Sequence, residues 1–321
     1  MSVRSATATE ATARKLSGGS GAPPATPATA LELRDVAVRY GEREILRGVT
    51  LSVAPGTVYA LLGRNGSGKP SLIRCLLGQQ LPQRGRARLL GFDSWAERPA
   101  ALGRIGVVPE EPDAPPHLTP RELADLCSEL YPSWSPAAVE ARFTRFGVPR
   151  DTAFAQLSKG QKGHTLLALA LGHEPELLVL DDPTLGLDAV ARRAVFDELI
   201  GELAERGTTV LLASHDLEGV ERIAERVGIL HGGGLVVDES LEQLKARFRR
   251  LRCPRDLEGS ELEAHGMLAL RDRPWGRDAL VQRFDAARFA AQAQRLDLTA
   301  EAVPLEEIFL ALAGEGSAGA P

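Results

Sequence analysis

Apolar residues fall into short runs along most of this chain, and the spacing of these runs predicts its fold. Early runs of β-type residues predict strands at residues 31–38, 45–53, 57–62 and 105–108. Two continuous apolar runs, 177–180 and 208–213, are typical of strands buried in a parallel sheet. Helical stretches at 189–206 and 216–226 follow these two runs. The alternation predicts an α/β sheet with right-handed crossovers.

A mostly helical insert is expected at about residues 112–160. Thr119 can cap a helix whose first turn holds Pro120 and Glu122, the residues that favour a helix start at those positions. A second polar-proline pair, at residues 135–136, predicts the start of another helix.

The two ends of the chain differ from this central pattern. Residues 1–30 are dominated by Ala, Thr, Ser, Gly and Pro, so we expect a disordered leader, although its composition slightly resembles a transit peptide. Residues 31–238 form the main predicted domain, and residues 239–321 an accessory α+β region. Within that region a helix, two strands and a closing helix are expected at residues 241–250, 267–270, 279–284 and 305–312.

The composition restricts the possible functions. With 321 residues, 44% hydrophobic and 25% charged, the chain is typical of a soluble globular protein with a sizeable core. Its net charge of −5 argues against a nucleic-acid partner. Cys75, Cys127 and Cys253 are too few and too far apart for a disulfide framework, which favours a reducing cytosol. No apolar stretch approaches the roughly 18 residues needed to span a bilayer, so any membrane role requires a partner.

A glycine-rich turn lies between the strand expected at 57–62 and a following helix. Its residues are Gly63, Arg64, Asn65, Gly66, Ser67, Gly68 and Lys69. In such a turn the backbone N–H groups face phosphate oxygens, and the helix N-terminus adds positive potential. Lys69 would reach the β- and γ-phosphates of a nucleotide. A glycine turn with a chance lysine is the alternative, but the position between strand and helix favours a P-loop.

The residue after the P-loop lysine departs from the usual pattern. Ser or Thr is expected there as a magnesium ligand, whereas this chain has Pro70. Proline is accommodated in the first turn of a helix, but it lacks both the hydroxyl and the backbone N–H. Ser71 follows one position late, and its hydroxyl is not expected to reach the metal. The turn therefore predicts phosphate binding with weakened magnesium binding.

Two carboxylates follow the apolar run at 177–180. Asp181 is placed to anchor magnesium at the phosphate end of the sheet, and Asp182 to act as general base on the attacking water. An acidic turn after a strand is common in isolation. The preceding P-loop and the following residues 183–184, Pro-Thr, favour the catalytic interpretation.

The sequence at residues 157–161 is Leu-Ser-Lys-Gly-Gln. Ser158 and Gln161 have the spacing of a capping box, so the simplest interpretation is a helix start. Together with the P-loop and Asp181, the stretch resembles the LSGGQ signature of ABC ATPases, and the resemblance extends over residues 30–238. It implies a P-loop NTPase fold with a RecA-like core, an N-terminal antiparallel β subdomain, a helical insert and a small C-terminal α+β tail.

The resemblance also implies a head-to-tail dimer. In this family the signature of one subunit closes over the γ-phosphate held by the P-loop of another. Ser158, Gly160 and Gln161 would stabilise phosphate charge at that interface, where a capped helix start presents its N–H groups. The expected partner is a second ATPase subunit, identical or related.

Further positions match the family residue by residue. Tyr40 matches the A-loop aromatic that stacks on adenine, and residues 185–188 match the D-loop. His215 matches the switch histidine that contacts the γ-phosphate. Glu110 occupies the Q-loop position, where it would hold water or metal and sense the helical insert. Taken alone, Tyr40 would be ordinary sheet surface and His215 a structural histidine.

Two of these positions carry an unusual residue. Glu110 stands where Gln is usual and adds negative charge. Asp182 stands where Glu is usual, which withdraws the carboxylate by about 1.5 Å. A misplacement of about 1 Å can cost on the order of 100-fold in rate. Slow hydrolysis is therefore expected.

These features predict the ATP-binding, ATP-hydrolysing subunit of an ABC transporter, with ATP and Mg²⁺ as cofactors. The single ATPase domain, Lys159 in the signature and the short tail resemble ABC-2-type export systems. The subunit would power translocation by a separate polytopic membrane permease. It would lie at the cytoplasmic face of the membrane through that partner.

Two other functions stay open at this stage. A hydrolysis-impaired regulatory subunit is one, because Pro70 stands at the magnesium-ligand position and Asp182 at the catalytic-base position. An ABC ATPase acting in translation or DNA repair is the other, although such proteins carry two ATPase domains or long coiled coils.

A basic run near the start of the tail has two interpretations. Its members are Arg247, Arg249, Arg250 and Arg252. They form either a solvated helix face or a contact with a permease or anionic lipid. The interleaved Phe248 and Leu251 are expected in the core.

Overall fold

The computed structural model describes residues 29–257 and 260–313. The disordered leader expected at residues 1–30 lies almost wholly outside this part of the chain. The first sheet is antiparallel, in the order β2-β1-β4-β5. Its strands are β1 (Leu31–Tyr40), β2 (Arg43–Val53), β4 (Arg84–Leu89) and β5 (Phe92–Asp93). The two strands predicted at the start of the chain are therefore confirmed.

The central sheet has six strands in the order β10-β9-β3-β8-β7-β6. They are β3 (Val58–Leu62), β6 (Ile105–Val108), β7 (Leu177–Asp181), β8 (Thr209–Ala213), β9 (Arg226–His231) and β10 (Gly234–Ser240). All pair in parallel except β10, which is antiparallel to β9. The apolar runs predicted as buried parallel strands are confirmed as β7 and β8.

Helices cover both faces of the central sheet, which explains its unbroken apolar strands. On β7, Leu177 and Val179 belong to one core cluster, together with Leu72 of α1 (Lys69–Leu76) and the antiparallel sheet. Leu178 and Leu180 belong to the cluster on the other face. That cluster includes residues of α5 (Lys159–Ala170), α6 (Ala189–Arg206) and α7 (Leu217–Ile223). A short helix, α2 (Arg98–Leu102), precedes β6.

The helix predicted at 216–226 is wrong at its C-terminal end. Asp216 caps α7 through its carboxylate, which accepts a hydrogen bond from the Gly219 N–H, but the helix ends at Ile223. Arg226 already pairs with Tyr59 as the first residue of β9. Strand pairing with a distant partner therefore overrides the local helical pattern.

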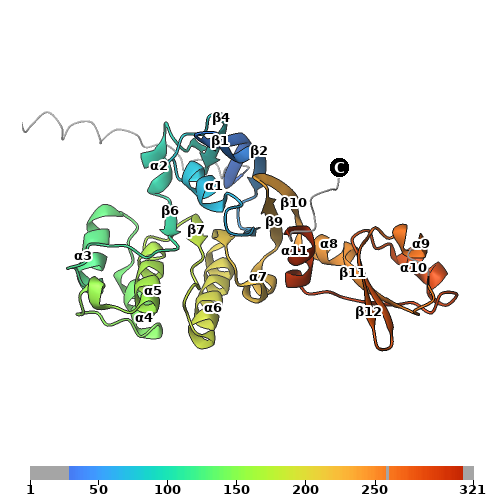
Figure 1. The fold of residues 1–321 in the computed structure, drawn as a ribbon. Coiled ribbons are helices and arrows are strands. Elements are labelled where there is room, and N and C mark those ends of the chain that lie inside the picture. Colours follow the sequence, from blue (N-terminus) through green and yellow to red (C-terminus); the bar gives the residue numbers. More distant parts are fainter. Residues whose placement is uncertain (1–28, 258–259, 314–321) are drawn as a thin grey trace, which may run out of the picture.

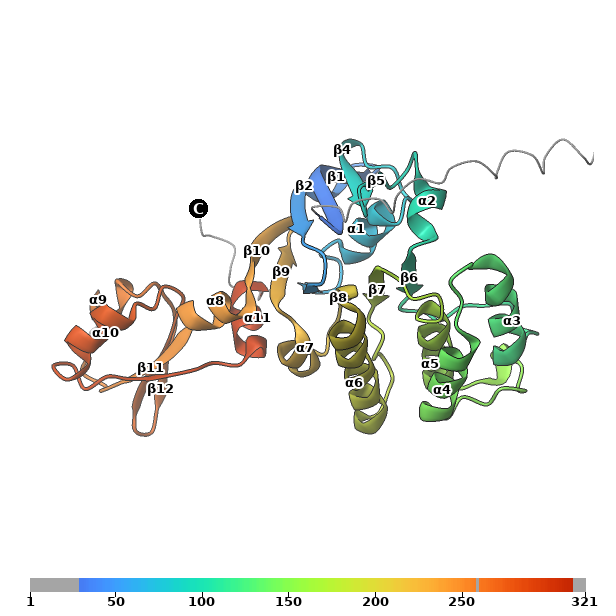
Figure 2. The same cartoon turned by 180° about the vertical axis from the view of Figure 1, so that it is seen from behind.

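The helical insert is attached at one end of the central sheet (Figures 1 and 2). It contains α3 (Pro120–Leu130), α4 (Pro136–Arg145), a single 3₁₀ turn (Phe154–Gln156) and α5. Thr119 and Glu122 form a capping box at the start of α3, so the predicted helix start is confirmed. Ser135 caps α4 through a hydrogen bond from the Ala138 N–H, as also expected.

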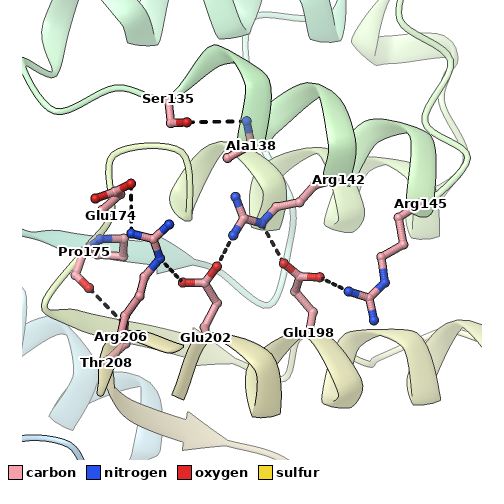
Figure 3. Close-up of polar contacts among 10 residues, drawn as sticks. All are labelled: Ser135, Ala138, Arg142, Arg145, Glu174, Pro175, Glu198, Glu202, Arg206 and Thr208. Atoms are coloured by element: carbon pink, nitrogen blue, oxygen red, sulfur yellow. Dashed lines mark hydrogen bonds and ion pairs between the residues drawn. The ribbon is translucent and has the colours of Figure 1, made fainter. Parts of the chain in front are cut away.

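A chain of ion pairs joins the insert to the core (Figure 3). Its members come from α4, α6 and the loop before β7, and are Arg145, Glu198, Arg142, Glu202, Arg206 and Glu174. The Arg142 guanidinium donates to Glu198 at 2.6 Å and also to Glu202. All three side chains are buried. Because a buried charge is tolerated only when it is paired, this chain of contacts fixes how α4 lies on α6.

The C-terminal tail forms a third, antiparallel sheet in the order β12-β13-β11-β14. Its strands are β11 (Arg249–Cys253), β12 (Met267–Arg273), β13 (Gly276–Val281) and β14 (Thr299–Glu301). Its helices are α8 (Leu241–Arg247), α9 (Ser260–Glu263), α10 (Ala286–Ala293) and α11 (Leu305–Ala313). The strand predicted at 267–270 and the closing helix are confirmed, whereas the strand predicted at 279–284 lies three residues earlier, as β13. Among the described residues, no helix combines the length and apolar character needed to cross a bilayer.

The helix predicted at 241–250 and the solvated helix face are both corrected by the structure. The helix ends at Arg247, because the next residues pair with β13 and β14 as strand β11. Three of the arginines form separate ion pairs, joining Arg247 to Glu239, Arg250 to Glu307 and Arg252 to Glu301, and Arg249 donates to the Lys245 carbonyl. Phe248 and Leu251 are buried, as expected.

Candidate nucleotide site

The turn between β3 and α1 requires glycine at several positions. Gly66 and Gly68 have φ angles of +81° and +111°, a region that favours glycine. A Cβ on Gly63 would come within 2.4 Å of the Ser67 hydroxyl, and one on Gly68 within 2.7 Å of Leu46. These glycines let the turn wrap closely around the start of α1, whose first N–H groups have no acceptor within the helix.

Lys69 lies at the first position of α1 and is buried against the turn. Its ammonium donates a hydrogen bond to the Gly63 carbonyl. Burial lowers the pKa of Lys69, while the charges of Asp181, Asp182 and Glu110 act in the opposite direction. The structure therefore brings the predicted P-loop lysine together with all three predicted acidic residues.

The Ser67 side chain also indicates that the turn can hold a phosphate. Its hydroxyl oxygen is buried and has no hydrogen-bond partner in the described part of the chain. Buried polar groups are nearly always paired. A phosphate oxygen held by the turn would supply the partner, so the turn fits a nucleotide.

Pro70 and Ser71 occupy the first turn of α1, as the sequence indicated. The Ser71 hydroxyl accepts a hydrogen bond from Arg74 at 3.1 Å. Arg74 also donates to the Tyr40 hydroxyl at 3.3 Å, and Tyr40 donates to Gln80 at 2.6 Å. Ser71 is thus engaged in the polar cluster around Tyr40.

Asp181 ends β7 beside the neighbouring strand β6, after which Glu110 follows. The pKa of Asp181 is raised to about 6, first by burial and then by the charge of Glu110, against the lowering effect of Lys69. Two carboxylates in this position are hard oxygen ligands of the kind that Mg²⁺ prefers. Within the described residues, however, no three acidic, His or Cys side chains form a complete metal cluster.

Asp182 is held toward the end of β8. Its φ of +49° is left-handed, a conformation in which Asp is enriched among non-glycine residues. Its carboxylate accepts hydrogen bonds from the Ser214 hydroxyl at 3.4 Å and the His215 N–H at 3.3 Å. The His215 Nε2 lies 3.7 Å from the second carboxylate oxygen, Oδ2. The candidate base and the candidate switch histidine are therefore neighbours.

A pocket of about 540 Å³ lies over the turn. It is lined by Arg64, Asn65, Gly66, Ser67, His215, His231, Gly232 and Phe309. The sequence did not predict His231, Gly232 or Phe309 as site residues. His231 ends β9, which parallel pairing places beside β3, and Gly232 follows it; Phe309 belongs to the distant helix α11. No local motif marks these residues.

Ser158, Gly160 and Gln161 do not line this pocket. Ser158 and Gln161 form the expected capping box at the start of α5. A Cβ on Gly160 would lie 2.9 Å from Leu187, so the signature faces the D-loop within this chain. Its approach to the γ-phosphate of another subunit stays a prediction.

Replacing Asp181 with Asn should stabilise the nucleotide-free protein above pH 7. The pKa of this carboxyl in the folded protein, about 6, exceeds the ordinary value of 3.8. The folded state therefore binds the proton more tightly, and the stability from this group falls as pH rises from about 4 to about 6. With allowance for solvent screening we expect a gain of about 1 kcal/mol.

Urea unfolding of both proteins at several pH values measures this effect. The advantage of Asp181→Asn should shrink as pH falls below about 6 and vanish near pH 4. A constant difference across that range would show that Asp181 does not titrate in this way.

Comparison with known proteins agrees with this geometry. A family model described as "ABC transporter" matches residues 46–185. The Nod factor export ATP-binding protein I of Rhizobium etli is 35% identical over 216 residues, covering 65% of this chain and 68% of that protein. The bacitracin transport ATP-binding protein BcrA of Enterococcus faecalis is 32% identical, covering 68% of this chain and 72% of that protein.

Solved structures show the same fold. An ATP-binding subunit of an ABC transporter has a TM-score of 0.62 and 28% identity, covering 68% of this chain and 93% of that one. A dimeric ATP-binding cassette with ADP and phosphate has a TM-score of 0.60 at 22% identity, covering 66% of this chain and 98% of that one. The expected P-loop NTPase fold is confirmed, and this chain belongs to the ATP-binding proteins of the ABC transporter family.

Proposed function

We propose that this chain hydrolyses ATP to power export by a separate polytopic membrane permease. The observation that carries the proposal is the convergence of Lys69, Asp181 and Asp182 at the carboxyl ends of the parallel strands β3 and β7, which both pair with β8. The similarity to export and transport ATP-binding proteins supports the transport role. The chain would work at the cytoplasmic face of the membrane, attached through the permease.

Different residues of the site would bind different parts of the nucleotide and its metal ion. Residues 63–69 would hold the phosphates, and Tyr40 would stack on adenine. Asp181 and Glu110 would hold Mg²⁺, which neutralises phosphate charge in this class of reaction. Because Pro70 has no hydroxyl and Ser71 is bound to Arg74, the nucleotide phosphates and water would complete the metal's ligands.

A second ATPase subunit would complete the site. Ser158, Gly160 and Gln161 lie at a capped helix start that does not reach the pocket of its own chain. In a head-to-tail dimer they would face the γ-phosphate bound to the other subunit, where N–H groups favour negative charge.

Cross-linking in membranes tests both expected partners: a second ATPase subunit and a polytopic membrane protein should be captured. Capture of neither would contradict the transport role.

A hydrolysis-impaired regulatory subunit is the second candidate function. The relatives do not support it, so it rests on Pro70 and on the attachment of Asp182 to Ser214 and His215. Under this alternative the chain would bind ATP as a clamp while a competent partner hydrolyses it. Robust magnesium-dependent turnover by the unmodified protein alone would exclude it.

Replacing Pro70 with Ser should raise magnesium-dependent turnover by roughly tenfold. The new hydroxyl would add a metal ligand, and groups that support a metal site typically contribute 10–100-fold in affinity or activity. ATP affinity without magnesium should stay within about twofold. Steady-state phosphate release at varied Mg²⁺ measures the change.

Pro70→Ala is the matched control, because it restores the backbone N–H without the hydroxyl. Turnover should rise in Pro70→Ser and change little or not at all in Pro70→Ala. Equal gains from both variants would assign the defect to the missing N–H, and no gain from either would contradict the magnesium argument.

A further inference from the structure

The last described helix, α11, returns from the tail to the ATPase core. Leu305 and Ile308 are fully buried in the core cluster that also holds Val220 of α7 and Ile229 of β9. Figures 1 and 2 both show α11 beside β9 and α7, between the central sheet and the tail sheet. The tail and the core therefore share one packed helix.

Polar contacts join α11 both to the ATPase core and to the C-terminal tail. On the core side, the Glu221 carboxylate of α7 accepts a hydrogen bond from the Leu305 N–H at 2.8 Å. The same carboxylate pairs with Lys245 of α8. On the tail side, Glu307 of α11 pairs with Arg250 of β11. A shift of α11 would disturb both sets of contacts.

Residues of α11 and residues next to α7 both line the candidate nucleotide pocket. Phe309 of α11 lines the pocket together with the turn residue Ser67 and the switch histidine His215. His215 directly precedes the cap residue of α7, the helix that carries Glu221. A Cβ on Gly219 of α7 would come within 2.1 Å of Phe196, so α7 is also closely packed on α6. Dense packing of this kind transmits small displacements.

We propose that α11 couples the nucleotide site to the C-terminal sheet. Phe309 is a positioning residue that forms the apolar wall of the phosphate pocket. A displacement of His215 passes through α7 and its Glu221 contact to α11, and from α11 to β11. Because coupling between two sites is reciprocal, a partner bound to the tail would change ATP affinity by the same factor as ATP changes affinity for that partner.

The inference rests on ATP binding at the proposed site. Hydrogen exchange of the full-length chain tests ATP binding and the coupling separately. Adding ATP should slow amide exchange in the P-loop turn and, by about fivefold, in α11 and β11. Protection of the turn without any change in α11 and β11 would overturn the coupling and leave the proposed function intact. Protection of neither region would overturn both.

Two variants on the same helix identify the responsible side chain. Phe309→Ala should weaken ATP binding by about fivefold and reduce the ATP-induced protection of β11 by at least half. Leu310→Ala is the control, since Leu310 is 61% exposed and does not line the pocket, and both values should stay within twofold.

A purely structural role for Phe309 would give a different result. Phe309→Ala would then lower the unfolding temperature but leave the ATP-induced protection of β11 unchanged, which would contradict the proposal. Phe309→Leu keeps an apolar wall and provides the same comparison if the alanine variant does not fold. It should retain most of the coupling.

Discussion

Lys69→Ala should weaken ATP binding by about 100-fold or more and abolish magnesium-dependent hydrolysis. The ammonium of Lys69 is buried beside the Gly63 carbonyl and close to the three acidic residues of the site. Its removal leaves phosphate charge facing Asp181 and Asp182 without a protein cation in this position. Loss of one preorganised charge-stabilising group typically costs about 100- to 1,000-fold in rate. Equilibrium binding and phosphate release measure the two effects.

Lys162→Ala provides the control for lost positive charge. Lys162 lies on α5 against the Phe154 ring and is not among the residues that line the pocket. Its removal should leave ATP affinity within twofold. If both variants bind ATP as tightly as the wild type, the turn is not the nucleotide site.

Arg142→Met should lower the free energy of unfolding by about 3–5 kcal/mol. The substitution leaves Glu198 and Glu202 buried without the cation that lies between them (Figure 3). Breaking a buried pair from one side costs about this much, because Glu198 and Glu202 then keep only the more exposed Arg145 and Arg206 as partners. Urea unfolding measures the loss.

Arg145 offers a matched control within the same network. It pairs with Glu198 at 2.7 Å, but its side chain is 52% exposed. Exposed pairs contribute about 1 kcal/mol or less, so Arg145→Met should be nearly neutral. Equal losses from both arginine variants would contradict the assignment of the buried pair as the decisive contact.

Replacing all three buried charged residues of the network together provides a second test of the role of the buried ion pairs. The triple variant Arg142→Met, Glu198→Met and Glu202→Met leaves no buried charge among them. Apolar replacements of buried ion pairs are often neutral or stabilising, so it should recover most of the stability lost in Arg142→Met.

The sequence predicts those parts of the fold that depend on local patterns. Continuous apolar runs identify β7 and β8 because both faces of each strand are covered by other elements. The capping box of Thr119 and Glu122 marks the start of α3 because all its contacts lie within one turn. The glycine turn before Lys69 is recognisable for the same reason.

Contacts between distant segments explain the remaining differences. Arg249 and its neighbours look helical locally, but pairing with β13 and β14 makes them a strand. Phe309 lines the candidate nucleotide pocket only because α11 folds back onto α7 and β9. Its position in a short apolar helix gives no indication of this contact.

In the site, too, some features can be recognised in the sequence and others depend on contacts between distant segments. The absence of a hydroxyl at Pro70 is visible in the sequence, whereas the engagement of Ser71 with Arg74 is visible only in the structure. Likewise, Asp182 can be recognised as a shortened acid, but its left-handed backbone and its bonds to Ser214 and His215 depend on β8.

Magnesium-dependent phosphate release by the purified full-length chain tests the central claim most directly. The account predicts saturable release from ATP that requires Mg²⁺, is absent in Lys69→Ala and increases in Pro70→Ser. Tight ATP binding without release, in the presence of Mg²⁺, would support the regulatory alternative. Release that is unchanged in Lys69→Ala would contradict the assignment of the site.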